Sequence, residues 1–211
     1  MTATVRTGLA RAKVQTLDRV VASIGETAIT RSDVEREYAL EALIDQGRLP
    51  RTPADAAELA RVRDRLIDQK LLALEAQQAG EGSPNVEKIA GERLAGIRRK
   101  FPSQETLDVD LRSLGMDEQQ LLQVLEAQER ALEVINQRLR PGASPDQSEI
   151  QAYYREQFVP EYAKRGQGAP PPLAEVESRI REILTQQKID EQLAAWLREL
   201  RQMRHVKVHP F

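Results

Sequence analysis

Side chains that commonly carry out catalysis or bind metal ions are scarce in this sequence. Cysteine is absent, which excludes disulfides, thiolate nucleophiles and zinc–cysteine sites. The two histidines, His205 and His209, lie on one face of a strand-like segment near the end of the chain. Four strand residues span about 13 Å, so the two imidazoles are too far apart to bind one metal ion. We therefore predict no metal site and no cofactor.

The sequence also contains no motif of a known catalytic centre. The chain lacks a glycine-rich phosphate loop, an HExxH motif and a nucleophile elbow. Carboxylates are abundant, but they alternate with lysine and arginine on outward helical faces, as around Glu75 and Glu126. This mixture is typical of a solvated surface with pairing between successive helical turns. We therefore predict no catalytic residues and a protein that is not an enzyme.

The charge and hydropathy of the chain exclude two classes of partner. Its 31 basic and 33 acidic residues are spread along 211 positions and leave a net charge of −2. A nucleic-acid binder needs a basic stripe to neutralise phosphates, so we expect no nucleic-acid partner. No apolar run approaches the roughly 18 residues that cross a bilayer, so we expect no membrane insertion.

Most of the chain has the apolar spacing of amphipathic helices. Thr30 with Asp33, and Asp117 with Gln120, have the spacing of reciprocal N-terminal caps. Apolar residues three and four positions apart predict helices that begin near Thr30, Pro53, Pro84, Ser103, Asp117 and Ser144, and a long helix from Leu173 to Leu200.

Short β-prone runs lie at the two ends of this helical chain. Val20–Ile24 and Thr27–Ile29 flank Gly25, and a hairpin of two strands is marginally stable by itself. The only other strand-like segment is Val206–Val208. We therefore predict that it pairs with Val20–Ile24. The predicted fold class is mainly α, a multi-helix module with a small antiparallel sheet that joins the N-terminal hairpin to the C-terminal strand.

A change in composition suggests how the chain is organised. Pro160–Pro172 contains Gly166, Gly168 and three consecutive prolines, which predicts an exposed linker. The predicted organisation is a flexible N-terminal segment (1–18), an N-terminal helical region (19–159), this linker (160–172), and a C-terminal helix and strand (173–211) that complete the same domain.

Aromatic residues on the helical stripes have two possible roles. Tyr153 and Tyr154 could form a binding platform, although their spacing from Ile150 and Phe158 favours core packing. Trp196 is predicted to anchor the last helix against the others. Apolar helix faces usually form a core, but a face left open can bind an extended or helical peptide.

Five segments in order resemble SurA-like periplasmic chaperones and their parvulin-type foldase relatives. The likeness covers nearly all of residues 19–209. The segments are RVVASIGETAITRSDVEREY (19–38), RLIDQKLLALEAQQAG (65–80), LRSLGMDEQQLLQVLEAQ (111–128), SPDQSEIQAYYREQF (144–158) and VESRIREILTQQKIDEQLAAWLRELRQMRHVKV (176–208).

The sequence departs from the foldase members of this family in one segment, where a whole domain is missing. Their prolyl-isomerase domain would lie between Tyr154 and Leu173, where this chain has a connection far too short for a globular domain. The resemblance therefore implies the chaperone module alone, without prolyl-isomerase activity. It also implies a periplasmic location and a signal peptide that has been removed.

The function implied is that of an ATP-independent chaperone for outer-membrane protein assembly, whose partners are unfolded or nascent envelope polypeptides. We predict a shallow peptide-binding surface formed by Tyr38, Leu43, Met116, Leu121 and Leu122. Two alternatives stay open. One is a structural or adaptor protein that forms a homodimer by exchange of its C-terminal helix, and the other is a peptidyl-prolyl isomerase.

Overall fold

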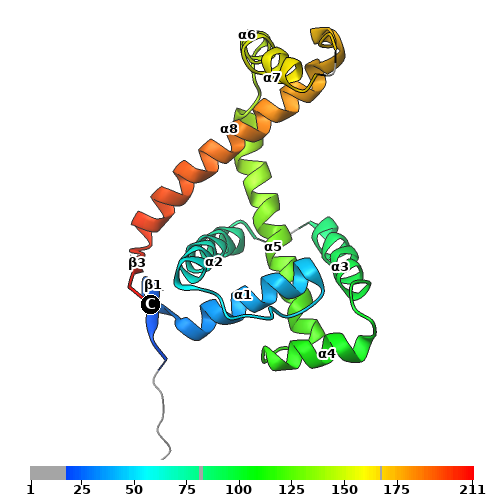
Figure 1. Cartoon of the computed structure of the whole chain (residues 1–211). Coiled ribbons are helices and arrows are strands. Elements are labelled where there is room, and N and C mark those ends of the chain that lie inside the picture. Colours follow the sequence, from blue (N-terminus) through cyan, green and yellow to red (C-terminus); the bar gives the residue numbers. More distant parts are fainter. Residues whose placement is uncertain (1–17, 81–82, 167) are drawn as a thin grey trace, which may run out of the picture.

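A computed structural model describes residues 18–80, 83–166 and 168–211 of the chain. The predicted N-terminal segment therefore lies outside the described residues except for Asp18. The chain begins with a hairpin, passes through a succession of helices, and returns along one long helix to a strand beside the hairpin (Figure 1). The prediction of a mainly α fold with a small antiparallel sheet is confirmed.

The sheet joins the two ends of the chain, as predicted. Strands β1 (Val20–Ile24), β2 (Thr27–Thr30) and β3 (Lys207–Val208) lie in the order β2-β1-β3, and both pairings are antiparallel. Ala22 lies opposite Val208 in the pairing of β1 with β3. The strand β3 is one residue shorter than predicted, because the Val206 N–H donates to the Arg201 carbonyl (2.9 Å) and completes the helix end before it.

Five helices form the main body of the molecule. Their bounds are α1 (Arg31–Gln46), α2 (Ala56–Gln78), α3 (Pro84–Arg98), α4 (Gln104–Ser113) and α5 (Glu118–Leu139). The predicted reciprocal caps are present at Thr30 and Asp117. Helix α2 begins three residues after Pro53, because the Asp55 carboxylate accepts the Glu58 N–H (2.8 Å) and fixes the start there.

An arm of helices extends from the end of α5 (Figure 1). It comprises the 3₁₀ turn η1 (Arg140–Gly142), α6 (Gln147–Tyr153), the π-helical turn η2 (Tyr154–Phe158) and α7 (Val159–Lys164). The long helix α8 (Leu173–Met203) then returns from the arm to β3.

The predicted linker at 160–172 is wrong for its first part, which is helical as α7. Pro160 lies in the first turn of α7, where a missing N–H is tolerated, and the π-helical turn precedes it. The rings of Tyr154, Phe158 and Tyr162 stack in succession along this segment, with centroids 5.7 and 5.9 Å apart. The helix ends before Gly166, whose φ is +66°.

Buried apolar side chains form two clusters, and helix α5 contributes to both. The first cluster, named here the sheet core, joins the sheet to α2, α8 and the C-terminal part of α5 through residues that include Ile29, Ile67, Leu71, Ile135, Trp196 and Leu200. The second cluster, the α3–α4 core, joins α3 and α4 to the C-terminal half of α1 and the start of α5, and includes Leu43, Leu94, Leu107, Leu121 and Leu125.

A glycine permits the close approach of α1 to the end of α3. Gly47 ends α1 with φ +68°, and a Cβ there would collide with Lys100 Cβ and lie 2.9 Å from the Lys100 carbonyl oxygen. The Lys100 ammonium donates to the carbonyls of Ile44 (2.7 Å) and Asp45 (3.1 Å), which are otherwise unpaired at the helix end.

Gly47→Ala is therefore expected to lower the free energy of unfolding by about 2 kcal/mol, because it adds a steric clash to the strain of a left-handed backbone. Gly115 is a matched control, since its φ is +72° but nothing lies within 4 Å of its added Cβ. Gly115→Ala should cost about 1 kcal/mol, for the backbone strain alone. Equal losses for the two variants in urea denaturation would contradict the steric argument.

Candidate peptide-binding groove

An open apolar groove of about 700 Å³ lies between the two cores. Helix α2 forms one wall with Leu66, Leu72 and Ala73, and α5 forms the other wall. The residues of α5 that line the groove include Val124, Ala127, Ala131, Leu132 and Ile135. Leu132 is 49% exposed, although it lies on the same stripe of α5 as the buried Leu125 and Ile135. The groove is therefore an apolar concave surface that water reaches.

Small side chains create this groove. Ala73 on α2 and Ala127 and Ala131 on α5 take up little of the space between the two helices. Larger residues at these positions would fill the space and turn it into core. The groove continues into a shallower hollow of about 400 Å³, which shares Val124 and Ala127 with it and extends to Leu114 and Met116.

Charged side chains surround the apolar surface. Arg93 of α3 donates to Glu129 (2.6 Å) and to the Gln128 side chain (3.0 Å), so that this pair lies across one rim. Glu37 of α1 lines the opposite side and is half-buried. Burial raises the pKa of the Glu37 carboxyl, and the nearby Glu41 raises it further, whereas a hydrogen bond from Gln69 and the charges of Lys70 and Arg65 act against this.

The structure places the five predicted peptide-binding residues in different environments. Met116 lines the hollow that continues the groove, and it is half-buried. Tyr38 lines a separate, polar hollow of about 450 Å³ between α1 and α2. Leu122 packs against the α3–α4 core and lies outside the lining of the groove.

Two of the five predictions need correction. Leu43 and Leu121 have no exposed surface and lie inside the α3–α4 core, so a peptide cannot reach them while that core is closed. Both residues lie on apolar stripes, and a stripe alone does not show whether another helix covers it. The spacing that suggested an open surface here reflects core packing.

The groove also contains two residues that were not among the predicted site residues, Leu132 and Glu37. Leu132 shares its helical stripe with Leu125, Ile135 and Leu139, which are all buried, whereas Leu132 lines the groove together with Leu72 and Ala73 of α2. Glu37 follows Val34 by three positions, so it lies next to a buried face. A carboxylate next to the buried face of an amphipathic helix was the one feature of the sequence that could have indicated this part of the site.

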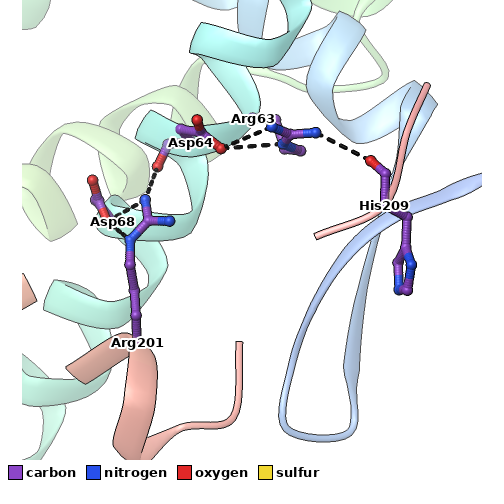
Figure 2. A network of polar contacts seen from close by, with 5 residues as sticks. All are labelled: Arg63, Asp64, Asp68, Arg201 and His209. Carbon is purple, nitrogen blue, oxygen red and sulfur yellow. Dashed lines mark hydrogen bonds and ion pairs between the residues drawn. The ribbon is translucent and has the colours of Figure 1, made fainter. Parts of the chain in front are cut away.

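A polar network holds α2, one wall of the groove, to the end of the chain (Figure 2). The Arg201 guanidinium of α8 donates to Asp68 Oδ1 (2.8 Å) and to the Asp64 carbonyl (3.0 Å). Arg63 donates to the His209 carbonyl (3.1 Å), and its guanidinium lies 5.4 Å from the centroid of the Phe211 ring. We name these contacts the clasp, because they join the C-terminal residues to α2.

Arg201→Ala is expected to destabilise the protein by about 1–2 kcal/mol, since it leaves the half-buried Asp68 carboxylate without its cation. Burial raises the pKa of Asp68, and Arg201 opposes that rise. In the variant, the half-buried Asp68 is unfavourable only when its carboxylate is ionised. The loss of unfolding free energy caused by Arg201→Ala should therefore shrink as the pH falls through the Asp68 pKa.

The matched control for this variant is Arg31→Ala, which removes an ion pair with Glu35 whose two side chains are about half exposed. An exposed pair of this kind contributes about 0.5 kcal/mol or less. Denaturant titrations at pH 7 and pH 4 measure both variants. A loss from Arg201→Ala that equals the control at pH 7 would contradict the role of the clasp.

Residues 18–80, 83–166 and 168–211 contain no group of three histidine, aspartate or glutamate side chains arranged to hold a metal ion. In the same ranges, no helix combines the length and the apolar character that crossing a membrane requires. The two histidines are exposed, and His205 has a left-handed backbone (φ +50°) at the end of α8.

Comparison with known proteins adds no relative. No protein-family model matches the sequence, and no curated protein matches it significantly.

Proposed function

We propose that this protein is an ATP-independent periplasmic chaperone that holds unfolded envelope or outer-membrane polypeptides in the groove between α2 and α5. The observation that carries the proposal is an apolar groove with a volume of about 700 Å³, which is open to solvent between two packed cores. Apolar surface left open to water costs free energy, and such surfaces often mark sites of protein–protein binding. The five-segment resemblance to SurA-like chaperones supports the same function.

The form of the groove suits weak and broad binding. Its lining combines aliphatic side chains of α2 and α5 with charged and amide side chains. Burial of apolar side chains is non-directional, so many sequences can bind at a similar free energy. A chaperone without a nucleotide cycle needs such binding, because it must release its client when the client folds or passes to another acceptor.

Suppression of aggregation tests this proposal. A urea-unfolded porin is diluted into buffer with increasing amounts of the full-length protein, and light scattering is recorded. We expect scattering to fall as the protein approaches a few-fold molar excess, without ATP. Unchanged scattering at tenfold excess would contradict the proposed function. A peptide-isomerisation assay on the same sample should give the uncatalysed rate, since we propose no prolyl-isomerase activity.

A dimer that exchanges α8 is the alternative, as a structural or adaptor protein. The segment that joins α7 to α8 contains three prolines and two glycines and could direct α8 onto a second chain. In the structure, Arg201 of α8 and Arg204, which follows the end of α8, form ion pairs with Asp68 and Glu75 within one chain. Light scattering with size-exclusion chromatography distinguishes the two, and we expect a monomer.

A further inference from the structure

The Glu37 carboxylate is a charged group of the groove that has no cation paired with it, although the Gln69 side chain donates a hydrogen bond to it. It lines the apolar surface and is half-buried, and no ion pair found between the described residues includes it. Burying a carboxylate without a cation is unfavourable, and proteins usually pair or expose such a group. The position of Glu37 therefore points to a cation that comes from outside the chain.

The charges that face Glu37 come from three neighbouring helices. On α1 itself, Glu41 is already paired with Arg65 of α2, which donates to it through Nε (3.0 Å). Across the groove, Arg93 of α3 and Glu129 of α5 neutralise each other (2.6 Å). Lys70 of α2 also lines the groove and its charge lowers the pKa of Glu37, but Lys70 is exposed and forms no ion pair with Glu37 in the described residues. After these pairings, Glu37 is the half-buried charge of the groove lining that has no ion-pair partner among the described residues.

This arrangement matches the chemistry of lysine and arginine side chains. Both have an apolar stem that can lie along the aliphatic wall of the groove while the charged end reaches a carboxylate. A hydrogen bond between ionised groups at a partly desolvated site is stronger than one between neutral groups. An acidic client residue would instead place a second negative charge beside Glu37, which is unfavourable.

We propose that the groove selects apolar polypeptide segments that carry a lysine or arginine, and that Glu37 is the counterion for that residue. The inference rests on the proposed function, because it concerns which segments of a client the same groove prefers. It goes further in assigning a sequence preference and one residue that determines it. Apolar side chains of the segment contact Leu72, Leu132 and Ile135, and its cation reaches Glu37 at the side formed by α1.

Three labelled peptides test the preference with the full-length protein. Each has twelve residues of leucine, valine and serine, with lysine, glutamine or glutamate at one central position, and binding is measured by fluorescence anisotropy at low salt. We expect the lysine peptide to bind at least about tenfold more tightly than the glutamate peptide, with the glutamine peptide between them. Glu37→Gln should remove most of the difference in affinity between the lysine and glutamate peptides.

Glu35→Gln is the matched control, because Glu35 is an exposed residue of the same helix that lies outside the lining of the groove. It should retain the full preference for lysine. The preference should also weaken as the pH falls and Glu37 becomes protonated, whereas binding of the glutamine peptide stays constant. The raised pKa of Glu37 means that this loss begins at a higher pH than for an exposed glutamate.

The outcomes separate the two proposals. Equal affinity for the three peptides, or a preference that survives Glu37→Gln, would overturn the role of Glu37 and leave the chaperone function standing. Failure of all three peptides to bind would overturn the inference, and failure to protect unfolded porin as well would overturn the proposed function. Loss of the preference for lysine in both the Glu37 and the Glu35 variants would show an effect of total charge. That result would also overturn the role of Glu37.

Glu37→Gln has a second expected effect, on stability. Burial of the ionised carboxylate opposes folding, so the neutral amide should raise the free energy of unfolding at pH 7. The folded protein binds a proton at Glu37 more readily than the unfolded chain does, so the wild type regains this stability as the pH falls. The gain from the substitution should therefore disappear near pH 4. A variant less stable than the wild type at pH 7 would contradict this.

Discussion

Trp196→Ala is expected to lower the free energy of unfolding by about 3–5 kcal/mol, the largest loss predicted for any single substitution considered. Trp196 is 5% exposed and packs in the sheet core, where α8 meets α2 and the C-terminal part of α5. Its ring also lies 4.5 Å from the guanidinium carbon of Arg138, which stacks over it from α5. Truncation removes this anchor and leaves a cavity where α8 joins the body.

Trp196→Phe is the informative control. The indole Nε1 is buried and has no acceptor among the described residues, so phenylalanine removes an unsatisfied donor along with part of the ring. We expect a loss of about 1–2 kcal/mol for this variant. Urea denaturation followed by circular dichroism measures both. A loss below 1 kcal/mol for Trp196→Ala would show that α8 is not part of the cooperative core.

Leu132→Gln is expected to weaken binding of an unfolded client about 10-fold to 100-fold. A leucine side chain contributes roughly 1.5–3 kcal/mol when it passes from water to an apolar contact, and Leu132 lies exposed in the groove. The fold should be unaffected to within about 0.5 kcal/mol, because the side chain is already half exposed. Its carbonyl, which accepts from Asn136 (3.0 Å), is unchanged by the substitution.

Met203→Gln provides the matched control for this prediction. Met203 is 62% exposed at the end of α8 and lies outside the lining of the groove. Both substitutions replace an exposed apolar side chain with the same polar one. Titration of labelled unfolded porin should show weaker binding for the Leu132 variant alone. Equal affinities of the two variants would place the client surface elsewhere.

The local features of the fold could be predicted from the sequence because they depend on few residues. The caps at Thr30 and Asp117 require one side chain and one backbone N–H three positions away, and both are formed as predicted. The pairing of β1 with β3 was predictable because an isolated hairpin needs a further strand and Val206–Val208 was the only candidate. The first part of the predicted linker was wrong, because stacking aromatic rings extend the helix past Pro160 as far as Lys164.

The candidate site was less predictable, since it depends on which helices cover which apolar faces. Leu43, Leu121 and Leu132 occupy equivalent positions on apolar stripes, yet two are fully buried and the third is open. The difference arises from alanines on neighbouring helices, such as Ala73, whose small size leaves a groove. The spacing of apolar residues shows which face of a helix a residue lies on. It does not show which residue of a neighbouring helix packs against that face. The charge of Glu37 was visible in the sequence, but its desolvation depends on the tertiary packing.

Site-directed photo-crosslinking tests the central claim, that clients bind in the groove between α2 and α5, most directly. A photoreactive amino acid is placed at Leu132, a large and half-exposed side chain of the groove, or at Met203, and each protein is irradiated with unfolded porin. We expect crosslinks to the porin from position 132 and not from position 203, and an excess of unlabelled peptide should reduce them. Crosslinks of equal yield from both positions, or from position 203 alone, would contradict the claim.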